Sequence, residues 1–170
     1  IMWQLRYLVI YHAKKIDEPW LLGLVEHAHL PTILMSSYHA PFVETLQKKI
    51  QQQGLTERIT VLQADMGFLQ FAPQSFDIIW SEGAIYNIGF EKGVADWRRY
   101  LKAGGILVTS EITWLTDSRP PELQRYWDGE YPEINVASAK IRVLEKNGYS
   151  PIGYFVLPEH CWLDQYYRPM

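Results

Sequence analysis

Three acidic residues each follow a short apolar segment of this 170-residue sequence. Asp65, Glu82 and Glu111 come directly after, or one residue beyond, runs that read ITVLQ, FDIIW and GILVTS. A carboxylate in such a place can take a proton from a reacting group or orient a substrate by hydrogen bonding. Acids are also common at solvated strand ends, so a purely solvated role stays open for each of them.

The segment that follows the second of these runs, residues 81–87 (SEGAIYN), mixes small and polar residues. It lies between an apolar run and an amphipathic segment, and connecting loops held by such elements often carry functional residues. This loop is therefore the strongest local indication of a site.

Short apolar runs alternate with amphipathic segments along the whole chain. The runs predict strands at 7–11, 32–35, 59–63, 76–80, 105–110 and 151–157. Helical spacing of apolar residues, with proline or glycine at the ends, predicts helices at 20–29, 41–53, 90–101, 121–129 and 137–147. Fully apolar strands that alternate with helices are typical of parallel sheets covered on both faces. We therefore expect one α/β domain over residues 1–170, with a doubly wound, mostly parallel sheet.

Ligands of such sheets bind beyond the carboxyl ends of the strands, near the point where the strand order reverses. The candidate site residues are those that follow each predicted strand. They are Ser36, Ser37, Asp65, Met66, Ser81, Glu82, Gly83, Tyr86, Asn87, Glu111 and Trp114.

The composition limits the classes of binding partner that we expect for this protein. The 16 Lys and Arg against 19 Asp and Glu give a net charge of -3, which offers no basic footprint for nucleic acid or an anionic membrane. No apolar run reaches the length of a membrane span. The single cysteine, Cys161, excludes an internal disulfide and a thiolate zinc cluster, and it suits a reducing, cytoplasmic location. The histidines form no ligand set, so we expect no metal site.

Three longer segments carry a family resemblance. GLTERITVLQADM (54–66), SFDIIWSEGAIYNIGF (75–90) and WRRYLKAGGILVTSE (97–111) together resemble class I S-adenosylmethionine-dependent methyltransferases. The SEGAIYNIGFE run, with YPEI at 131–134 and LPEHCW at 157–162, is similar to a bacterial subgroup of the small-molecule type. The resemblance covers about residues 41–170. It implies a Rossmann-like methyltransferase fold, S-adenosylmethionine as cofactor, and transfer of a methyl group to a small-molecule acceptor.

The resemblance also implies roles for single residues. Asp65 matches the acid that hydrogen-bonds the adenine amino group, and Met66 matches a residue that packs on the ring; each could also be an ordinary loop residue. Ser81 and Gly83 match residues that line the methionine part of the cofactor. Ser37 stands where the family places an acid for the ribose hydroxyls.

On the acceptor side, Glu82 is the candidate catalytic residue, as a base or as a substrate orienter. Sulfonium methyl transfer relies mainly on in-line positioning, so a single carboxylate could suffice. Tyr86, Asn87 and Trp114 are expected on the substrate side, although a simple packing role stays open for Tyr86 and Trp114.

Two departures favour a different function. The family has a glycine-rich loop after the first strand, but no glycine lies between Tyr7 and Trp20, and Ser36 or Ser37 replaces the ribose-binding acid. Both ends also look short against the family, so we expect a sheet that is incomplete at both ends. The alternative is a non-catalytic methyltransferase-like module that has lost cofactor binding and serves in binding or assembly. The many aromatic residues also leave a homodimer interface open.

Overall fold

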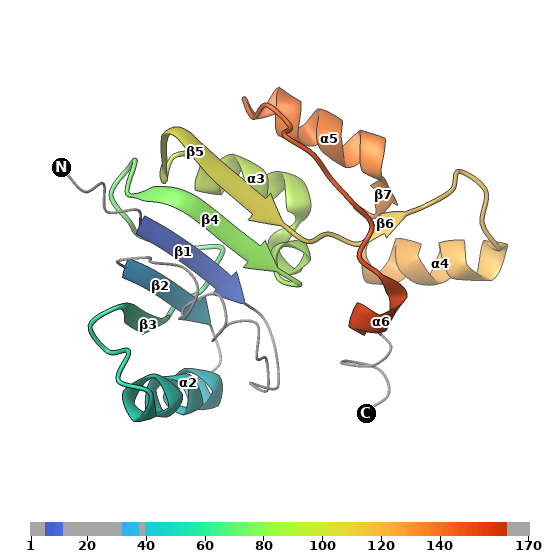
Figure 1. The fold of residues 1–170 in the computed structure, drawn as a ribbon. Helices are drawn as coiled ribbons and strands as arrows, with labels where there is room; N and C mark the ends of the chain where they lie inside the picture. Colours follow the sequence, from blue (N-terminus) through green and yellow to red (C-terminus); the bar gives the residue numbers. More distant parts are fainter. Residues whose placement is uncertain (1–5, 12–31, 38–39, 163–170) are drawn as a thin grey trace.

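The computed structural model describes residues 6–11, 32–37 and 40–162 (Figure 1). The predicted helix at 20–29 and residues 12–19, which stand where the family has its glycine-rich loop, lie outside these ranges. Among the described residues, no helix has both the length and the apolar character needed to cross a bilayer.

Within the described residues, five parallel strands form the central sheet. Its order is β3-β2-β1-β4-β5, and the strands are β1 (Arg6–Tyr11), β2 (Thr32–Ser37), β3 (Ile59–Gln63), β4 (Phe76–Glu82) and β5 (Leu101–Thr109). All four pairings are parallel. The chain proceeds outward from β1 to β3 on one side and from β4 to β5 on the other, so the order reverses between β1 and β4. The predicted α/β fold is confirmed.

Two helices connect neighbouring strands. Helix α2 (Ala40–Gln52) lies between β2 and β3 in sequence, and α3 (Phe90–Arg98) lies between β4 and β5 after the short 3-10 helix η1 (Ile85–Ile88). Crossovers of parallel strands are right-handed, and these two proceed in opposite directions. They therefore place α2 and α3 on opposite faces of the sheet, beside the strands that they join (Figure 1).

Helix α2 forms because its apolar residues share one face. Val43, Leu46 and Ile50 recur at helical spacing, and all three are buried. Gly54 follows with φ +68°, a left-handed conformation that glycine adopts without steric cost and that ends many helices. The helix predicted at 41–53 is confirmed.

The main core lies between the sheet and α3. Leu8 and Ile10 of β1 meet Phe90, Val94 and Trp97 of α3 in one buried cluster. These strand residues alternate along β1 and the helix residues recur at helical spacing, so each element presents one apolar face. Burial of this kind stabilises a domain by about 25 cal/mol per Å² of apolar surface.

The boundary between α3 and β5 differs from the prediction. The helix was expected to continue to Leu101, but it ends at Arg98, and Leu101 begins β5 opposite Phe76. The pairing then shifts, because Ile78 faces Ile106. Gly104, with φ +73°, lies inside this irregular stretch of β5 and does not end the helix. A bulge inserts extra residues into one strand, and glycine is frequent there.

The C-terminal part adds helices α4 (Pro121–Glu130), α5 (Ala137–Lys146) and α6 (Glu159–Trp162). A two-residue parallel pair, β6 (Thr113–Trp114) with β7 (Asn135–Val136), closes the segment that carries α4. Helix α5 packs against α3 on the outside of the core. The helices predicted at 121–129 and 137–147 are confirmed.

The predicted sixth strand at 151–157 is wrong. The segment contains no strand, and the side chains of Ile152, Tyr154, Phe155 and Val156 are 61–85% exposed. Its apolar sequence is compatible with a strand, but a strand also needs a neighbour for its backbone hydrogen bonds. Among the described residues, none pairs with it.

Candidate cofactor and substrate site

The carboxyl ends of the five strands share one edge of the sheet. The register sets Ser37 opposite Gln63 and Ser81 opposite Thr109, and it pairs Tyr11 with Glu82. The segments that follow β3, β4 and β5 therefore leave the sheet at the same edge, with β2 and β1 between β3 and β4. The side chains of Ser36 and Ser37 are not among those described, so only their place at the end of β2 is known.

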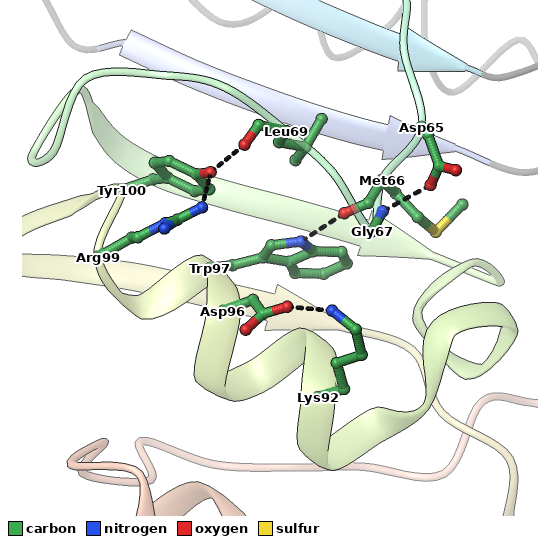
Figure 2. A network of polar contacts seen from close by, with 9 residues as sticks. All are labelled: Asp65, Met66, Gly67, Leu69, Lys92, Asp96, Trp97, Arg99 and Tyr100. Carbon is green, nitrogen blue, oxygen red and sulfur yellow. Dashed lines mark hydrogen bonds and ion pairs between the residues drawn. The ribbon is translucent and has the colours of Figure 1, made fainter.

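The segment after β3 is held against α3 by buried hydrogen bonds (Figure 2). The indole Nε1 of Trp97 donates to the carbonyl oxygen of Met66 at 3.0 Å, and the hydroxyl of Tyr100 donates to the carbonyl oxygen of Leu69. Asp65 itself is exposed, and its Oδ1 accepts a hydrogen bond from the backbone N–H of Gly67 at 2.8 Å. The Met66 side chain is only 7% exposed and belongs to the core, so its predicted packing on an adenine ring stays a prediction.

The ends of β4 and β5 are tied together at Ser81 and Gly83. The N–H of Gly83 donates to Oγ of Ser110 at 2.7 Å, and the N–H of Ser110 donates to the carbonyl oxygen of Ser81 at 3.0 Å. Ser81 is wholly buried, and its Oγ has no hydrogen-bond partner among the described residues. Gly83 has φ +55°, and a Cβ built there would meet no atom within 4 Å. The backbone is thus open to close approach at Gly83.

Glu82 is held by its own strand. Its Oε2 accepts a hydrogen bond from the indole Nε1 of Trp80 at 3.2 Å, two residues earlier on the same face of β4. The carboxylate is part-buried. This contact gives the predicted base a defined orientation at the carboxyl end of the sheet.

Tyr86 and Asn87 lie on η1, directly beyond that end. The Tyr86 ring packs edge-to-face against Tyr131, with 6.0 Å between centroids. Asn87 is exposed, and its Nδ2 donates to the carbonyl oxygen of Ala84 at 2.9 Å. The loop is therefore folded on itself and braced from outside by Tyr131.

The loops after β3 and β4 meet at Gly67 and Ile88. A Cβ built on Gly67 would lie 3.3 Å from Cγ2 of Ile88 and 3.3 Å from Oδ1 of Asp65. The carboxylate of Asp65 and the Ile88 side chain at the end of η1 therefore both lie beside this one glycine. This contact joins the two halves of the candidate site that the sequence could only place at the same edge.

A buried ionic cluster lies at the β5 side of the site. Nζ of Lys140 is 2.6 Å from Oε1 of Glu111, and the hydroxyl of Tyr131 donates to the same oxygen. Nζ of Lys140 also donates to the Tyr131 hydroxyl at 3.0 Å, and it lies 4.6 Å from the centroid of the Phe90 ring. The side chains of Lys140 and Glu111 are 8% and 7% exposed.

Burial sets the protonation of this cluster. Loss of solvent raises the pKa of Glu111, while its bonds to Lys140 and Tyr131 act in the opposite direction. Burial raises the pKa of Tyr131 far above its ordinary value, and the adjacent Glu111 carboxylate raises it further. Tyr131 therefore remains a neutral hydrogen-bond donor at every physiological pH.

The sequence indicated Glu111 as a candidate site residue, but it did not indicate Tyr131 or Lys140. Tyr131 is in the YPEI segment and Lys140 is on the predicted helix at 137–147, yet neither position carried a sign of contact with Glu111. The one available signal was the position of Lys140, three residues before Val143 and four before Leu144, on the apolar face of its predicted helix.

Trp114 lies on β6 and packs against Arg119. The guanidinium of Arg119 lies 4.6 Å from its ring centroid, and its Nε1 is buried without a hydrogen-bond partner among the described residues. Oε2 of Glu111 is also buried without a hydrogen-bond partner among the described residues. Among the described residues, Trp114 and Glu111 thus leave one buried hydrogen-bond donor and one buried acceptor without a partner.

A family model described as a methyltransferase domain matches residues 22–109, more than half of the chain. The chain belongs to this methyltransferase family. A demethylmenaquinone methyltransferase of Bacteroides fragilis is 36% identical over 81 residues, which cover 47% of this chain and 32% of that protein. An uncharacterized protein of Haemophilus influenzae is 35% identical over 69 residues, which cover 39% of this chain and 28% of that protein.

Solved structures with the methyltransferase fold are similar to this chain. The [4+2]-cyclase SpnF superposes with a TM-score of 0.70 at 19% identity, over 88% of this chain and 52% of that one. Geranyl diphosphate C-methyltransferase of Streptomyces coelicolor, solved with S-adenosyl-L-homocysteine, gives a TM-score of 0.66 at 10% identity, over 88% and 54%. The chain thus spans about a third of the curated relatives and about half of these structures. The resemblance to methyltransferases and the Rossmann-like fold are confirmed.

Proposed function

We propose that this methyltransferase domain takes part in transferring a methyl group from S-adenosylmethionine to a small-molecule acceptor. The observation that carries the proposal is the contact at Gly67, which joins the Asp65 loop to the loop after β4. A cofactor that spans both loops would have its adenine near Asp65 and its sulfonium near Ser81 and Gly83.

The described residues fit such a cofactor. Asp65 is exposed and fixed through Oδ1, so its carboxylate can accept a hydrogen bond from an adenine amino group. The open backbone at Gly83 and the unpartnered hydroxyl of Ser81 suit the methionine part. Ser37 would offer the ribose a single hydroxyl in place of a carboxylate. When bound, S-adenosylmethionine supplies an electrophilic methyl group.

The chain's own contribution is orientation and a base. Glu82, steadied by Trp80, would accept the proton of an acceptor hydroxyl or amine, or would hold that group in line. Tyr86 and Asn87 would contact the acceptor from η1. Trp114 would contact it through its ring or its unpaired Nε1.

The acceptor is proposed to be a small molecule, as in the proteins that this chain resembles. One relative is named a demethylmenaquinone methyltransferase, and one structural neighbour was solved with geranyl diphosphate. A net charge of -3 gives no support for a nucleic-acid substrate. A cytoplasmic location and a homodimer are part of the same proposal, the latter resting on the aromatic content alone.

The second candidate is a non-catalytic module of the same fold. It is favoured by the absence of glycine between Tyr7 and Trp20 and by serine at the end of β2. Isothermal titration with S-adenosylmethionine separates the two. Micromolar binding supports the enzyme, whereas no heat at millimolar cofactor contradicts it for this chain and leaves the module.

A further inference from the structure

The peptide unit between Met66 and Gly67 is hydrogen-bonded at both ends (Figure 2). Its carbonyl oxygen accepts from Nε1 of Trp97 at 3.0 Å, and its N–H donates to Oδ1 of Asp65 at 2.8 Å. The described residues contain no cis peptide bond, so the carbonyl and the N–H of this planar unit point in opposite directions. The Trp97 indole therefore binds the carbonyl side of this peptide, and the N–H on the opposite side binds the Asp65 carboxylate.

The Trp97 and Asp65 side chains at the two ends of this arrangement differ in how freely they can move. Trp97 is 1% exposed and belongs to the same buried cluster as Phe90 and Val94 of its helix. Asp65 is exposed, and an exposed carboxylate rotates freely unless something holds it. A donor on the carbonyl oxygen also polarises the peptide and strengthens its N–H as a donor. The rigid core residue can thus impose its position on the surface residue.

Gly67 keeps the three groups close. A Cβ at this position would come 3.3 Å from Oδ1 of Asp65 and equally close to Ile88. Such contacts are tighter than ordinary van der Waals packing, so the carboxylate lies directly over the glycine. A larger residue here would displace Asp65 without touching Trp97.

We propose that Trp97 is a positioning residue that sets the direction of the Asp65 carboxylate through the Met66–Gly67 peptide. The inference rests on the proposed function, because the group that Asp65 would receive is the amino group of adenine. Trp97 touches no cofactor itself. Its effect is selectivity for a purine that carries an amino group over one that carries a carbonyl.

Tyr100 provides a matched control. It is 2% exposed, lies just beyond α3, and donates from its hydroxyl to the carbonyl oxygen of Leu69 in the same loop. Tyr100→Phe removes this buried hydrogen bond to a loop carbonyl, together with the one that the hydroxyl accepts from Arg99, and leaves the Met66–Gly67 peptide bonded as before. With a merely structural role for Trp97, neither Trp97→Phe nor Tyr100→Phe would change the preference between the two kinds of purine.

The experiment measures binding of S-adenosylhomocysteine and S-inosylhomocysteine, which differ in the amino group, by isothermal titration. We expect the wild type and Tyr100→Phe to prefer the adenosine compound by about tenfold or more, the effect of one hydrogen bond to a charged group. Trp97→Phe should lower this preference to about twofold, close to the value for Asp65→Ala. An unchanged preference in Trp97→Phe, or an equal loss in Tyr100→Phe, overturns the inference.

A measurement without ligand separates this inference from the proposed function. Amide hydrogen exchange of Gly67 should become about tenfold faster in Trp97→Phe and stay unchanged in Tyr100→Phe, since only the first variant loosens the peptide. If the wild type binds neither compound, the proposed function fails, while the exchange rate still decides the positioning role. Unchanged exchange at Gly67 overturns it.

Gly67→Ala tests the same geometry with Trp97 in place, should Trp97→Phe not fold. The added Cβ presses on Oδ1 of Asp65, so the preference for the adenosine compound should fall at least about threefold. If the preference survives in Gly67→Ala, the direction of Asp65 does not set it and the inference is overturned.

Discussion

Nζ of Lys140 lies 2.6 Å from Oε1 of Glu111, and both side chains are more than nine-tenths buried. Lys140 belongs to α5 and Glu111 follows β5, so the pair fastens the C-terminal helices to the carboxyl edge of the sheet. The Tyr131 hydroxyl bonds to both members, and its ring packs against Tyr86 of the candidate site.

Lys140→Met should destabilise the protein strongly. Removing one partner of a buried ion pair leaves the other charge uncompensated, which costs about 3–5 kcal/mol. The double variant Glu111→Gln/Lys140→Met removes both charges and should recover much of that loss. Urea unfolding of both variants measures the difference. A double variant no more stable than Lys140→Met would contradict the role given to the buried charge.

Glu82→Gln should lower methyl transfer by about 100-fold or more, the usual contribution of a general base. Binding of S-adenosylmethionine should stay unchanged, because Glu82 is proposed to act on the acceptor. The measurement is release of S-adenosylhomocysteine with an acceptor that the wild type methylates. Trp80→Phe, which removes the hydrogen bond to Oε2 but keeps the carboxylate, is the control and should cause a smaller loss. Intact turnover in Glu82→Gln would show that the carboxylate is not the base.

Glu133→Ala should loosen the start of α3. Oε2 of Glu133 accepts a hydrogen bond from the N–H of Glu91 in the first turn, at 3.2 Å. Loss of such a capping contact costs about 0.5–2 kcal/mol. Thermal unfolding measures the loss, with the exposed Glu130→Ala as control. Equal melting temperatures for the two variants would mean that Glu133 does not cap the helix.

Gly89→Ala should be more damaging than Glu133→Ala. Gly89 has φ +89°, which L side chains rarely adopt, and a Cβ there would lie 2.5 Å from Oε1 of Glu133. The substitution therefore adds backbone strain, about 1–2 kcal/mol, to loss of the cap. In Gly89→Ala/Glu133→Ala the clash disappears while the strain and the loss of the Glu133 cap remain, so the double variant should be less unstable than the sum of the two single losses. If the double variant is as unstable as the sum of the single losses, the clash is absent.

The stability of the folded protein at alkaline pH should depend on the ionisation of Tyr149. Burial raises the pKa of its hydroxyl from 10.0 to about 12, although Arg98 acts in the opposite direction. Between these values the folded state keeps a proton that the unfolded state has lost, so the free energy of unfolding falls as pH rises from 10 to 12. Tyr149→Phe should make this fall less steep, as measured by urea unfolding across that range. Parallel pH profiles for wild type and Tyr149→Phe would contradict the shift.

Local patterns in the sequence predicted most of the central elements. Strand β3 falls at 59–63 as predicted, and α2 has its apolar residues on one face, because periodicity and glycine punctuation are properties of neighbouring residues. The segment 151–157 shows the limit of that reasoning. Its residues favour a strand, but a strand forms only where another edge receives its backbone hydrogen bonds, and sequence does not say where that edge is.

Some features of the candidate site could likewise be predicted from the sequence, and others could not. Asp65, Glu82 and Glu111 could be placed at one edge from sequence, since parallel strands deliver their carboxyl ends there. The packing of α3 brings Trp97 to the Met66–Gly67 peptide. The packing of α5 brings Lys140 to Glu111, and the end of α4 brings Tyr131 to the same carboxylate. Contacts between elements distant in sequence depend on packing angle and register. The sequence by itself determined which residues reach the site edge; only the tertiary structure decided which partners orient them there.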